Sequence, residues 1–216
     1  MEVIKIGNYI YERKSDGEFY VTKKEGSDNN PHLFKNKGIP EKYINSTFED
    51  FFALSPNYKI EIDKIKKYIT ENNYIEKGIG LFISGPINSG KTFLTSLIEK
   101  ELLKKGLNGF FYSFTEIIDS FSLSGWSLYS QSLKDLNFLC IDNFENILKE
   151  ESYFLNRIKD IFNYYDLNNK IIIINSKKRL EDFYETPLRE VVAILHRNII
   201  PIYLMNSFEV DNEISL

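Results

Sequence analysis

The segment at residues 79–92 reads IGLFISGPINSGKT, and it constrains the fold more than any other part of the chain. It opens with a short apolar run, and its last residues begin a stretch, 91–105, in which apolar side chains recur at helical spacing. Gly85 and Gly90 stand between the two, where glycine permits backbone conformations that a side chain would block. An apolar strand that passes through a glycine-containing loop into an amphipathic helix is one unit of a helix-covered parallel sheet.

The chain repeats this alternation from Gly38 onward. Apolar runs that predict strands stand at 81–84, 109–114, 138–142, 170–175 and 199–204. Segments that predict helices stand at 48–54, 57–72, 91–105, 115–121, 154–165 and 187–195, with a less regular helix around Trp126 at 122–137. The pattern therefore predicts an α/β fold, in which a parallel sheet is covered by helices on both faces.

Polar residues at the predicted helix starts indicate where the helices begin. Capping-box spacing is found in two pairs, Ser46 with Glu49 and Ser113 with Glu116. Pro187 suits the first position of a helix that is capped by Thr186.

The first thirty residues differ from the rest. Two amphipathic stretches, VIKIGNYIY and FYVTKK, flank SDGE, and Asp-Gly between alternating residues predicts a β-hairpin. A polar segment rich in turn formers follows and predicts a linker. We therefore expect a hairpin appendage with its linker at residues 1–30 and a single larger domain at 31–216.

Composition narrows the class of protein further. The single cysteine, Cys140, excludes an internal disulfide or a cysteine-based zinc cluster, and its apolar neighbours predict burial. A formal net charge of −4 and a pI near 5.4 count against a surface built to coat duplex DNA. No secretory signal or apolar run of membrane-spanning length is evident, which predicts a cytoplasmic protein without a membrane partner.

The loop at 85–92 matches the phosphate-binding pattern G-x-x-x-x-G-K-T at every specified position. In such loops the backbone N–H groups and the helix N-terminus point at phosphates. Lys91 is expected to contact the β- and γ-phosphates, and Thr92 to ligate Mg²⁺. The predicted nucleotide-binding residues of this segment are Gly85, Pro86, Asn88, Ser89, Gly90, Lys91, Thr92 and Phe93. ATP and Mg²⁺ are therefore the expected cofactors.

Two other strands end in polar residues that we expect at the same edge of the sheet. The run LCID ends at Asp142, which we expect to hold Mg²⁺ through water. The alternative is that Asp142 caps the following helix. The run IIIINS ends at Asn175 and Ser176, and one of these is a candidate to reach the γ-phosphate or the attacking water; the alternative is a turn role.

Five segments together resemble the ATPase module of the DnaC/DnaI bacterial helicase loaders and the related IstB-type helper ATPases. They are GIPEKYINSTFEDF at 38–51, GPINSGKT, FFYSFTEIIDSF, NFLCIDNFE and IIIINS. The resemblance covers residues 38 to about 204. It implies an AAA+ fold without the usual C-terminal helical lid, and it implies that Ile39, Pro40 and Tyr43 lie against the adenine.

The resemblance also implies partners. Such loaders use ATP and single-stranded DNA to place a replicative ring helicase, and they act as oligomers in which an arginine senses the neighbour's γ-phosphate. Arg189 and Arg197 are the candidates for that arginine, although their spacing is wider than in the family, and a solvated surface role is the alternative. The family's larger N-terminal helicase-binding domain, which often binds zinc, has no counterpart in the thirty residues here.

Asn143 departs from the family pattern in a way that bears on catalysis. It stands after Asp142, where a second acid is normal, and an amide can orient water but has no basic oxygen. The catalytic candidates are therefore Asp142, Asn143 and Asn175, with Glu145 and Glu116 as alternative carboxylates. We expect a nucleotide binder with weak or absent hydrolysis.

Three functions remain open at this point. The first is an ATP-binding helicase loader or replication accessory factor. The second is a transposition helper ATPase, and the third is a non-catalytic adaptor that modulates a helicase or loader. Lys177, Lys178 and Arg179 are candidates for contacting the phosphates of single-stranded DNA, and the alternative is that they are solvated surface residues. Trp126 and Tyr129 are candidates for stacking on its bases, and the alternative is core packing.

Overall fold

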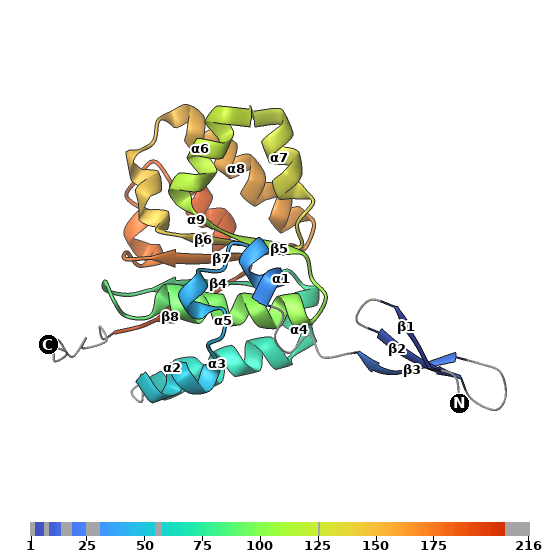
Figure 1. Cartoon of the computed structure of the whole chain (residues 1–216). Coiled ribbons are helices and arrows are strands. Elements are labelled where there is room, and N and C mark those ends of the chain that lie inside the picture. The colour runs from blue at the N-terminus through green and yellow to red at the C-terminus, as the bar shows by residue number, and fades with distance from the viewer. Residues whose placement is uncertain are drawn as a thin grey trace, which may run out of the picture.

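A five-stranded, all-parallel sheet forms the centre of the protein (Figure 1). The computed structural model describes residues 3–6, 9–13, 19–24, 31–54, 58–124 and 126–205. The strands are β4 (Gly80–Ser84), β5 (Gly109–Ser113), β6 (Phe138–Asp142), β7 (Ile171–Ser176) and β8 (Ile199–Tyr203), in the order β5-β6-β7-β4-β8. Because β4 lies between β7 and β8, the loop that follows it lies within the carboxyl edge of the sheet and not at its end.

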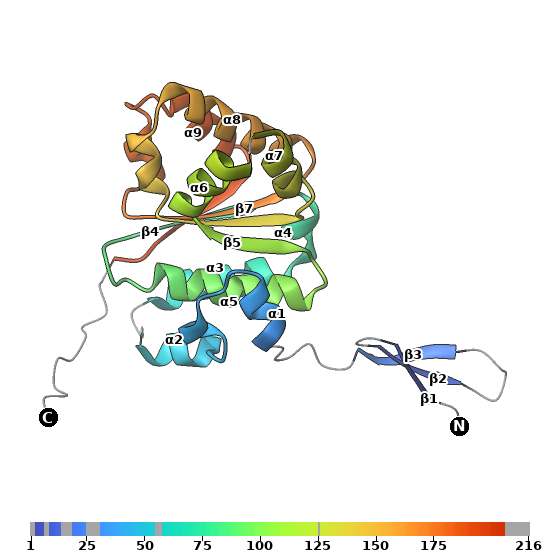
Figure 2. The ribbon, with the colours of Figure 1, turned by 45° about the horizontal axis from the view of Figure 1, so that its top comes forward.

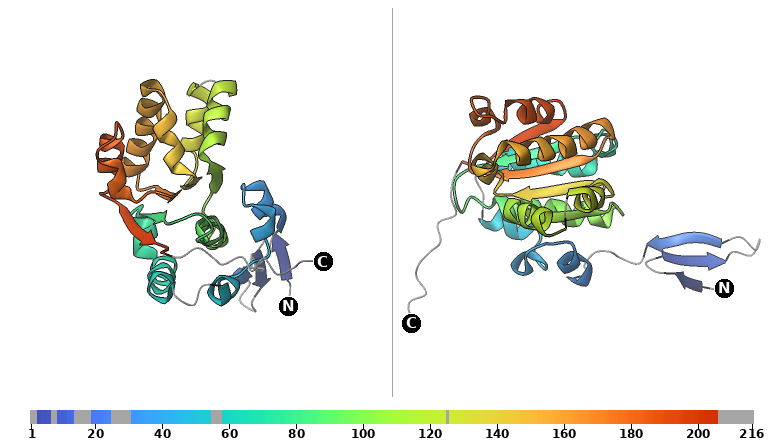
Figure 3. Two further views of the ribbon diagram at one scale, coloured as in Figure 1. Left: turned by 90° about the vertical axis from the view of Figure 1, so that its left-hand side faces the viewer. Right: turned by 90° about the horizontal axis from the view of Figure 1, so that it is seen from above.

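Helices cover both faces of this sheet, as the sequence predicts (Figures 2 and 3). One layer contains α1 (Pro31–Asn36), α2 (Phe48–Leu54), α3 (Lys59–Thr70), α4 (Asn72–Glu76) and α5 (Lys91–Lys104). The other contains α6 (Phe114–Ser124), α7 (Trp126–Lys134), α8 (Ser152–Leu167) and α9 (Arg189–Leu195). Short 3₁₀ helices lie at η2 (Glu41–Tyr43), η4 (Phe144–Lys149) and η5 (Leu180–Phe183).

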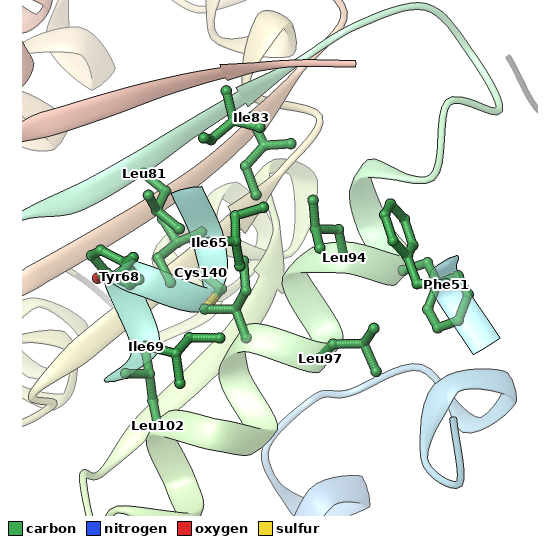
Figure 4. Close-up of a cluster of buried hydrophobic side chains, with 14 of the residues drawn as sticks. Phe51, Ile65, Tyr68, Ile69, Leu81, Ile83, Leu94, Leu97, Leu102 and Cys140 are labelled. Carbon is green, nitrogen blue, oxygen red and sulfur yellow. The ribbon is translucent and has the colours of Figure 1, made fainter. Parts of the chain in front are cut away.

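Alternate residues of each central strand enter different cores. Cys140 and Ile173 pack with the layer of α5, whereas Ile141 and Ile174 pack with the layer of α8. Figure 4 shows Cys140 among the apolar side chains of the first core. Its burial is as predicted, and it raises the pKa of the thiol. By the same alternation, Asp142 and Asn175 at the strand ends lie on the α5 face, which positions the candidate site.

Helix starts follow the predicted chemistry with two corrections. Ser113 and Glu116 form the expected capping box of α6: Ser113 N donates to Glu116 Oε2, and Glu116 N donates to Ser113 Oγ. For α2 the predicted pair, Ser46 with Glu49, is wrong. Thr47 and Asp50 form that box one residue later, because α2 begins at Phe48 and the cap must directly precede it.

The last helix also begins later than predicted. It starts at Arg189 and not at Pro187, since a turn occupies residues 184–188. Thr186 still serves this turn, because its Oγ1 accepts a hydrogen bond from Leu188 N and donates one to Phe183 O.

The N-terminal residues form three strands instead of the predicted two. These are β1 (Val3–Ile6), β2 (Tyr9–Arg13) and β3 (Phe19–Lys24), paired antiparallel in the order β1-β2-β3. The pairing of β2 with β3 agrees with the predicted hairpin, but the segment VIKIGNYIY is divided between β1 and β2. The segment contains the sequence Gly-Asn, a pair typical of two-residue hairpin connections, and residues 7 and 8 themselves lie outside the described residues. The Asp-Gly turn and the linker at 25–30 lie outside the described residues.

Candidate nucleotide site

Backbone geometry at the phosphate loop requires the motif's two glycines. A Cβ on Gly85 would lie 2.2 Å from the carbonyl oxygen of Leu204, and Gly85 N donates to Ser176 O at 3.2 Å. Gly90 has a left-handed backbone, with φ of 86°, and is the N-cap of α5. Asn88 is left-handed as well, with φ of 62°, a conformation that asparagine tolerates better than most residues.

Lys91 is the first residue of α5, and its side chain folds back over the loop. Its Nζ donates to Gly85 O at 2.9 Å, to Pro86 O at 2.5 Å and to Ser89 Oγ at 3.2 Å. Burial lowers the pKa of Lys91, and the nearby carboxylates of Asp142 and Glu145 oppose that effect. The ammonium group is therefore held against the glycine-containing loop by three hydrogen bonds.

The two predicted Mg²⁺ ligands lie in direct contact. Thr92 Oγ1 donates to Asp142 Oδ2 at 2.7 Å, while Asp142 Oδ1 accepts from Asn143 N at 2.9 Å. A hydroxyl and a carboxylate at the edge of a phosphate loop are the oxygen donors that Mg²⁺ prefers, so these residues fit the ion.

Asn143 has a left-handed backbone, with φ of 56° and ψ of 41°, and is the N-cap of η4. Its side chain is exposed. Asparagine, aspartate and glycine are the residues that adopt this conformation most readily, so the turn supplies a structural reason for asparagine here. The hydrogen bond to Asp142 uses its backbone and leaves the amide group uncommitted to that carboxylate.

Asn175 is fully buried and faces α5. Its Oδ1 accepts a 2.6 Å hydrogen bond from Thr95 Oγ1, whereas its Nδ2 has no hydrogen-bond partner among the described residues. Ser176, on the opposite face of β7, accepts from Lys178 N through its Oγ. Of the two candidates, Asn175 is therefore on the face of Asp142, in a hydrogen bond that the sequence did not predict.

The sequence did not predict where the two alternative carboxylates, Glu145 and Glu116, lie relative to the loop. Glu145 reaches the end of β7, where its Oε2 accepts from Lys177 N at 3.1 Å. Glu116, the other alternative carboxylate, is engaged in capping α6.

The predicted adenine residues Ile39 and Tyr43 both lie at the core of the α5 layer: Ile39 is buried in it, and the partly buried Tyr43 packs against it. Tyr43 also stacks face to face on the buried Phe93, with ring centroids 4.8 Å apart and an interplanar angle of 5°. Lys100, which the sequence analysis did not single out, holds this segment against α5, because its Nζ donates to Tyr43 O at 3.0 Å and also to Ser46 O.

The two candidate arginines lie at opposite ends of α9. Arg189 is exposed at its start, and Arg197 follows it and pairs with Asp166, Nη1 to Oδ2 at 2.8 Å. Arg197 precedes β8, so it lies toward the amino edge of the sheet, away from the loop of its own chain.

The candidate DNA contacts are largely engaged within the protein. Arg179 lies over the Tyr203 ring at 3.9 Å, and Lys177 pairs with Glu145. Tyr129 is buried, and the half-buried Trp126 packs edge-on against Phe121.

These features define an AAA+ P-loop α/β fold: a five-stranded parallel sheet with helices on both faces, and a phosphate loop between its β4 strand and the helix α5. The fold is that of DnaC/DnaI-type proteins. A crystal structure of DnaI is similar with a TM-score of 0.62 and 16% identity, over 78% of this chain and 93% of that one. For the DnaC helicase loader the TM-score is 0.58 and the identity 19%, over 80% of this chain and 98% of the other.

The replication initiator DnaA, solved with AMPPCP and single-stranded DNA, is also similar, with a TM-score of 0.61 and 19% identity over 77% of this chain. The present chain spans about half the length of the DnaA structures that it matches. No family model matches the chain, and no match was found among curated proteins. None of the helices in the described ranges has the length and apolar character needed to cross a membrane.

Proposed function

We propose that this protein binds ATP with Mg²⁺ and acts in the cytoplasm as a DNA replication accessory ATPase, in the manner of a helicase loader. The observation that carries the proposal is the contact of Thr92 with Asp142 beside the Lys91 ammonium group. It joins a hydroxyl, a carboxylate and a cation at one loop, which is the arrangement that a Mg²⁺-bound triphosphate needs. The extent of the likeness to the DnaI and DnaC structures supports the replication role.

Turnover is proposed to be slow, because Asn143 offers no basic oxygen to the attacking water. A non-catalytic adaptor is the second candidate function, and the exposed, left-handed Asn143 favours it, since this residue can be retained for the turn alone. A helper ATPase of transposition is less well supported, because the protein is acidic.

The proposed partner is a replicative ring helicase, and residues 1–30 are proposed to make the first contact as a unit separate from the domain at 31–216. Strand edges of a small sheet are suited to pairing with another protein. We further propose that the protein forms a nucleotide-dependent homo-oligomer, in which Arg189 or Arg197 reaches a neighbour's γ-phosphate. We also propose that it contacts single-stranded DNA.

Two measurements test it. Calorimetry should show binding of a non-hydrolysable ATP analogue that depends on Mg²⁺. The ring helicase of the same host should then co-purify with the full chain and not with a variant lacking residues 1–30 that still binds ATP. Equal recovery with both chains would place the interface on the larger domain, and no recovery with either would count against the loader role.

A further inference from the structure

Glu145 occupies a defined position at the carboxyl edge of the sheet. The left-handed turn at Asn143 directs the chain into η4, where Phe144 is buried beneath the sheet edge. Glu145 then accepts from Lys177 N at 3.1 Å, and its Oε1 lies 3.6 Å from Lys177 Nζ. The Glu145 side chain is 13% exposed and that of Lys177 is 51% exposed. The carboxylate is therefore sheltered, while the lysine that neutralises it remains accessible to solvent.

This carboxylate lies close to the phosphate loop. Ser176 accepts a hydrogen bond from Gly85 N, and the next residue, Lys177, donates its backbone N–H to Glu145, so consecutive residues of the chain contact the loop and Glu145. Glu145 also acts electrostatically on Lys91, whose pKa it raises, whereas Lys177 lowers that pKa. Glu145 and Asp142 are thus two carboxylates whose charge acts on the loop lysine.

The other candidates for assisting an attacking water are less suited. Glu116 caps α6, Asn175 is buried against Thr95, and Asn143 has an amide in place of a carboxylate. Asp142 is bound to Thr92 and is the expected metal ligand. Glu145 is therefore the carboxylate at this edge whose chemistry suits a general base.

We propose that Glu145 is the base for the slow ATP hydrolysis and that Lys177 restrains it through their ion pair. The inference rests on the proposed function and concerns regulation of the same site. Water attacks the γ-phosphorus, Glu145 takes the proton of that water, and the bond from phosphorus to the bridging oxygen breaks with its electron pair left on ADP. While the ion pair with Lys177 persists, the Glu145 carboxylate is held toward β7 and is not free to approach that water.

The experiment compares four variants of the full chain: Lys177→Ala, Glu145→Gln, the double variant, and Lys149→Ala, an exposed lysine on the same 3₁₀ helix as Glu145, as the matched control. Lys177→Ala removes the ammonium group but keeps the backbone N–H that orients Glu145. We expect it to raise steady-state ATP turnover about two- to fivefold, the range for loss of a partly exposed ion pair. Glu145→Gln should lower turnover at least about tenfold, and Lys149→Ala, which removes only a contact to Asn146, should match the wild type.

The double variant shows whether Lys177 restrains Glu145 as the base or whether their ion pair only supports the structure. It should show the low turnover of Glu145→Gln, because a released base matters only if the base is present. Turnover of Lys177→Ala at or below the wild-type rate would overturn the proposal, as would an increase that persists in the double variant. Lys177→Gln and thermal unfolding curves show whether a loss reflects misfolding. Failure of the wild type to bind the ATP analogue would instead refute the proposed function, so the two failures are distinguishable.

Discussion

Thr92 Oγ1 lies 2.7 Å from Asp142 Oδ2, although fifty residues separate them. Thr92 is in the first turn of α5, and Asp142 is the last residue of β6. Their contact exists because β6 presents Cys140 and Asp142 on the face that α5 covers. The predicted metal ligands are thus brought together by helix–sheet packing.

Asp142→Asn should weaken binding of the ATP analogue about tenfold in Mg²⁺ and change it little when Mg²⁺ is chelated. A neutral amide is a poorer ligand for a hard cation than a carboxylate. Calorimetry with and without Mg²⁺ makes the comparison, with the exposed Asp135→Asn as control. An equal loss in both conditions would show that Asp142 supports the fold of the loop and not the metal.

Lys91→Ala should weaken ATP binding at least about tenfold. A charge-assisted contact to a phosphate is worth about 1.5–3 kcal/mol, and Lys91 is the cation held at the loop. Lys105→Ala, at the other end of α5, removes a lysine that bonds Asn72 and should bind ATP normally. Equal affinities for the wild type and Lys91→Ala would refute the phosphate-loop assignment.

Asn143→Asp should raise ATP turnover, because it supplies a basic oxygen beside the expected attacking water. General-base assistance is typically worth about 10²–10⁴-fold, and a fraction of this is expected from a base placed by substitution. Aspartate is chosen over glutamate because it suits the left-handed backbone at this position. Turnover that falls in Asn143→Asp would contradict this prediction and would mean that Asn143 orients the water for Glu145, the base proposed above.

Thr95→Val should lower the free energy of unfolding by about 1–3 kcal/mol. It leaves the buried Asn175 Oδ1 without its donor, and an unpaired buried acceptor carries the full cost of desolvation. Adding Asn175→Leu should recover part of the loss, because both polar partners are then gone. Urea unfolding of the two single variants and the double variant measures this coupling; strictly additive losses would argue against it.

Glu99→Gln should stabilise the protein progressively as the pH rises. Glu99 is fully buried on α5, both of its carboxylate oxygens lack a hydrogen-bond partner among the described residues, and burial raises its pKa well above 4.5. The unfolded chain ionises first, so the wild type loses stability as pH rises above about 4.5, with a slope of at most about 1.4 kcal/mol per pH unit. Lys37 acts on this carboxyl in the opposite direction.

Urea unfolding at pH 5 and pH 8 checks this prediction. The stability difference between Glu99→Gln and the wild type should be larger at pH 8. A difference that does not depend on pH would mean that Glu99 has the same pKa in both states.

The sequence by itself determined the order of the strands and helices and the position of the phosphate loop. These features depend on short-range signals, namely apolar periodicity and the residues that a tight turn or a helix start requires. The Ser113–Glu116 box was predicted correctly for this reason, since its two members lie within one turn. The bounds of α2 were predicted correctly but its capping pair one residue too early, and the start of α9 was predicted two residues too early; local patterns resolve such shifts poorly.

Only the tertiary structure decided which polar residues meet. Thr95 and Asn175 are eighty residues apart, and Glu145 and Lys177 are thirty-two apart. Whether such residues touch depends on the strand order β6-β7-β4 and on which face each side chain takes. A shift of one residue along a strand would turn Asn175 away from α5 and Ser176 toward it. Packing between distant segments therefore decides which polar side chains lie near the loop, whereas consecutive residues of the sequence determine the loop itself.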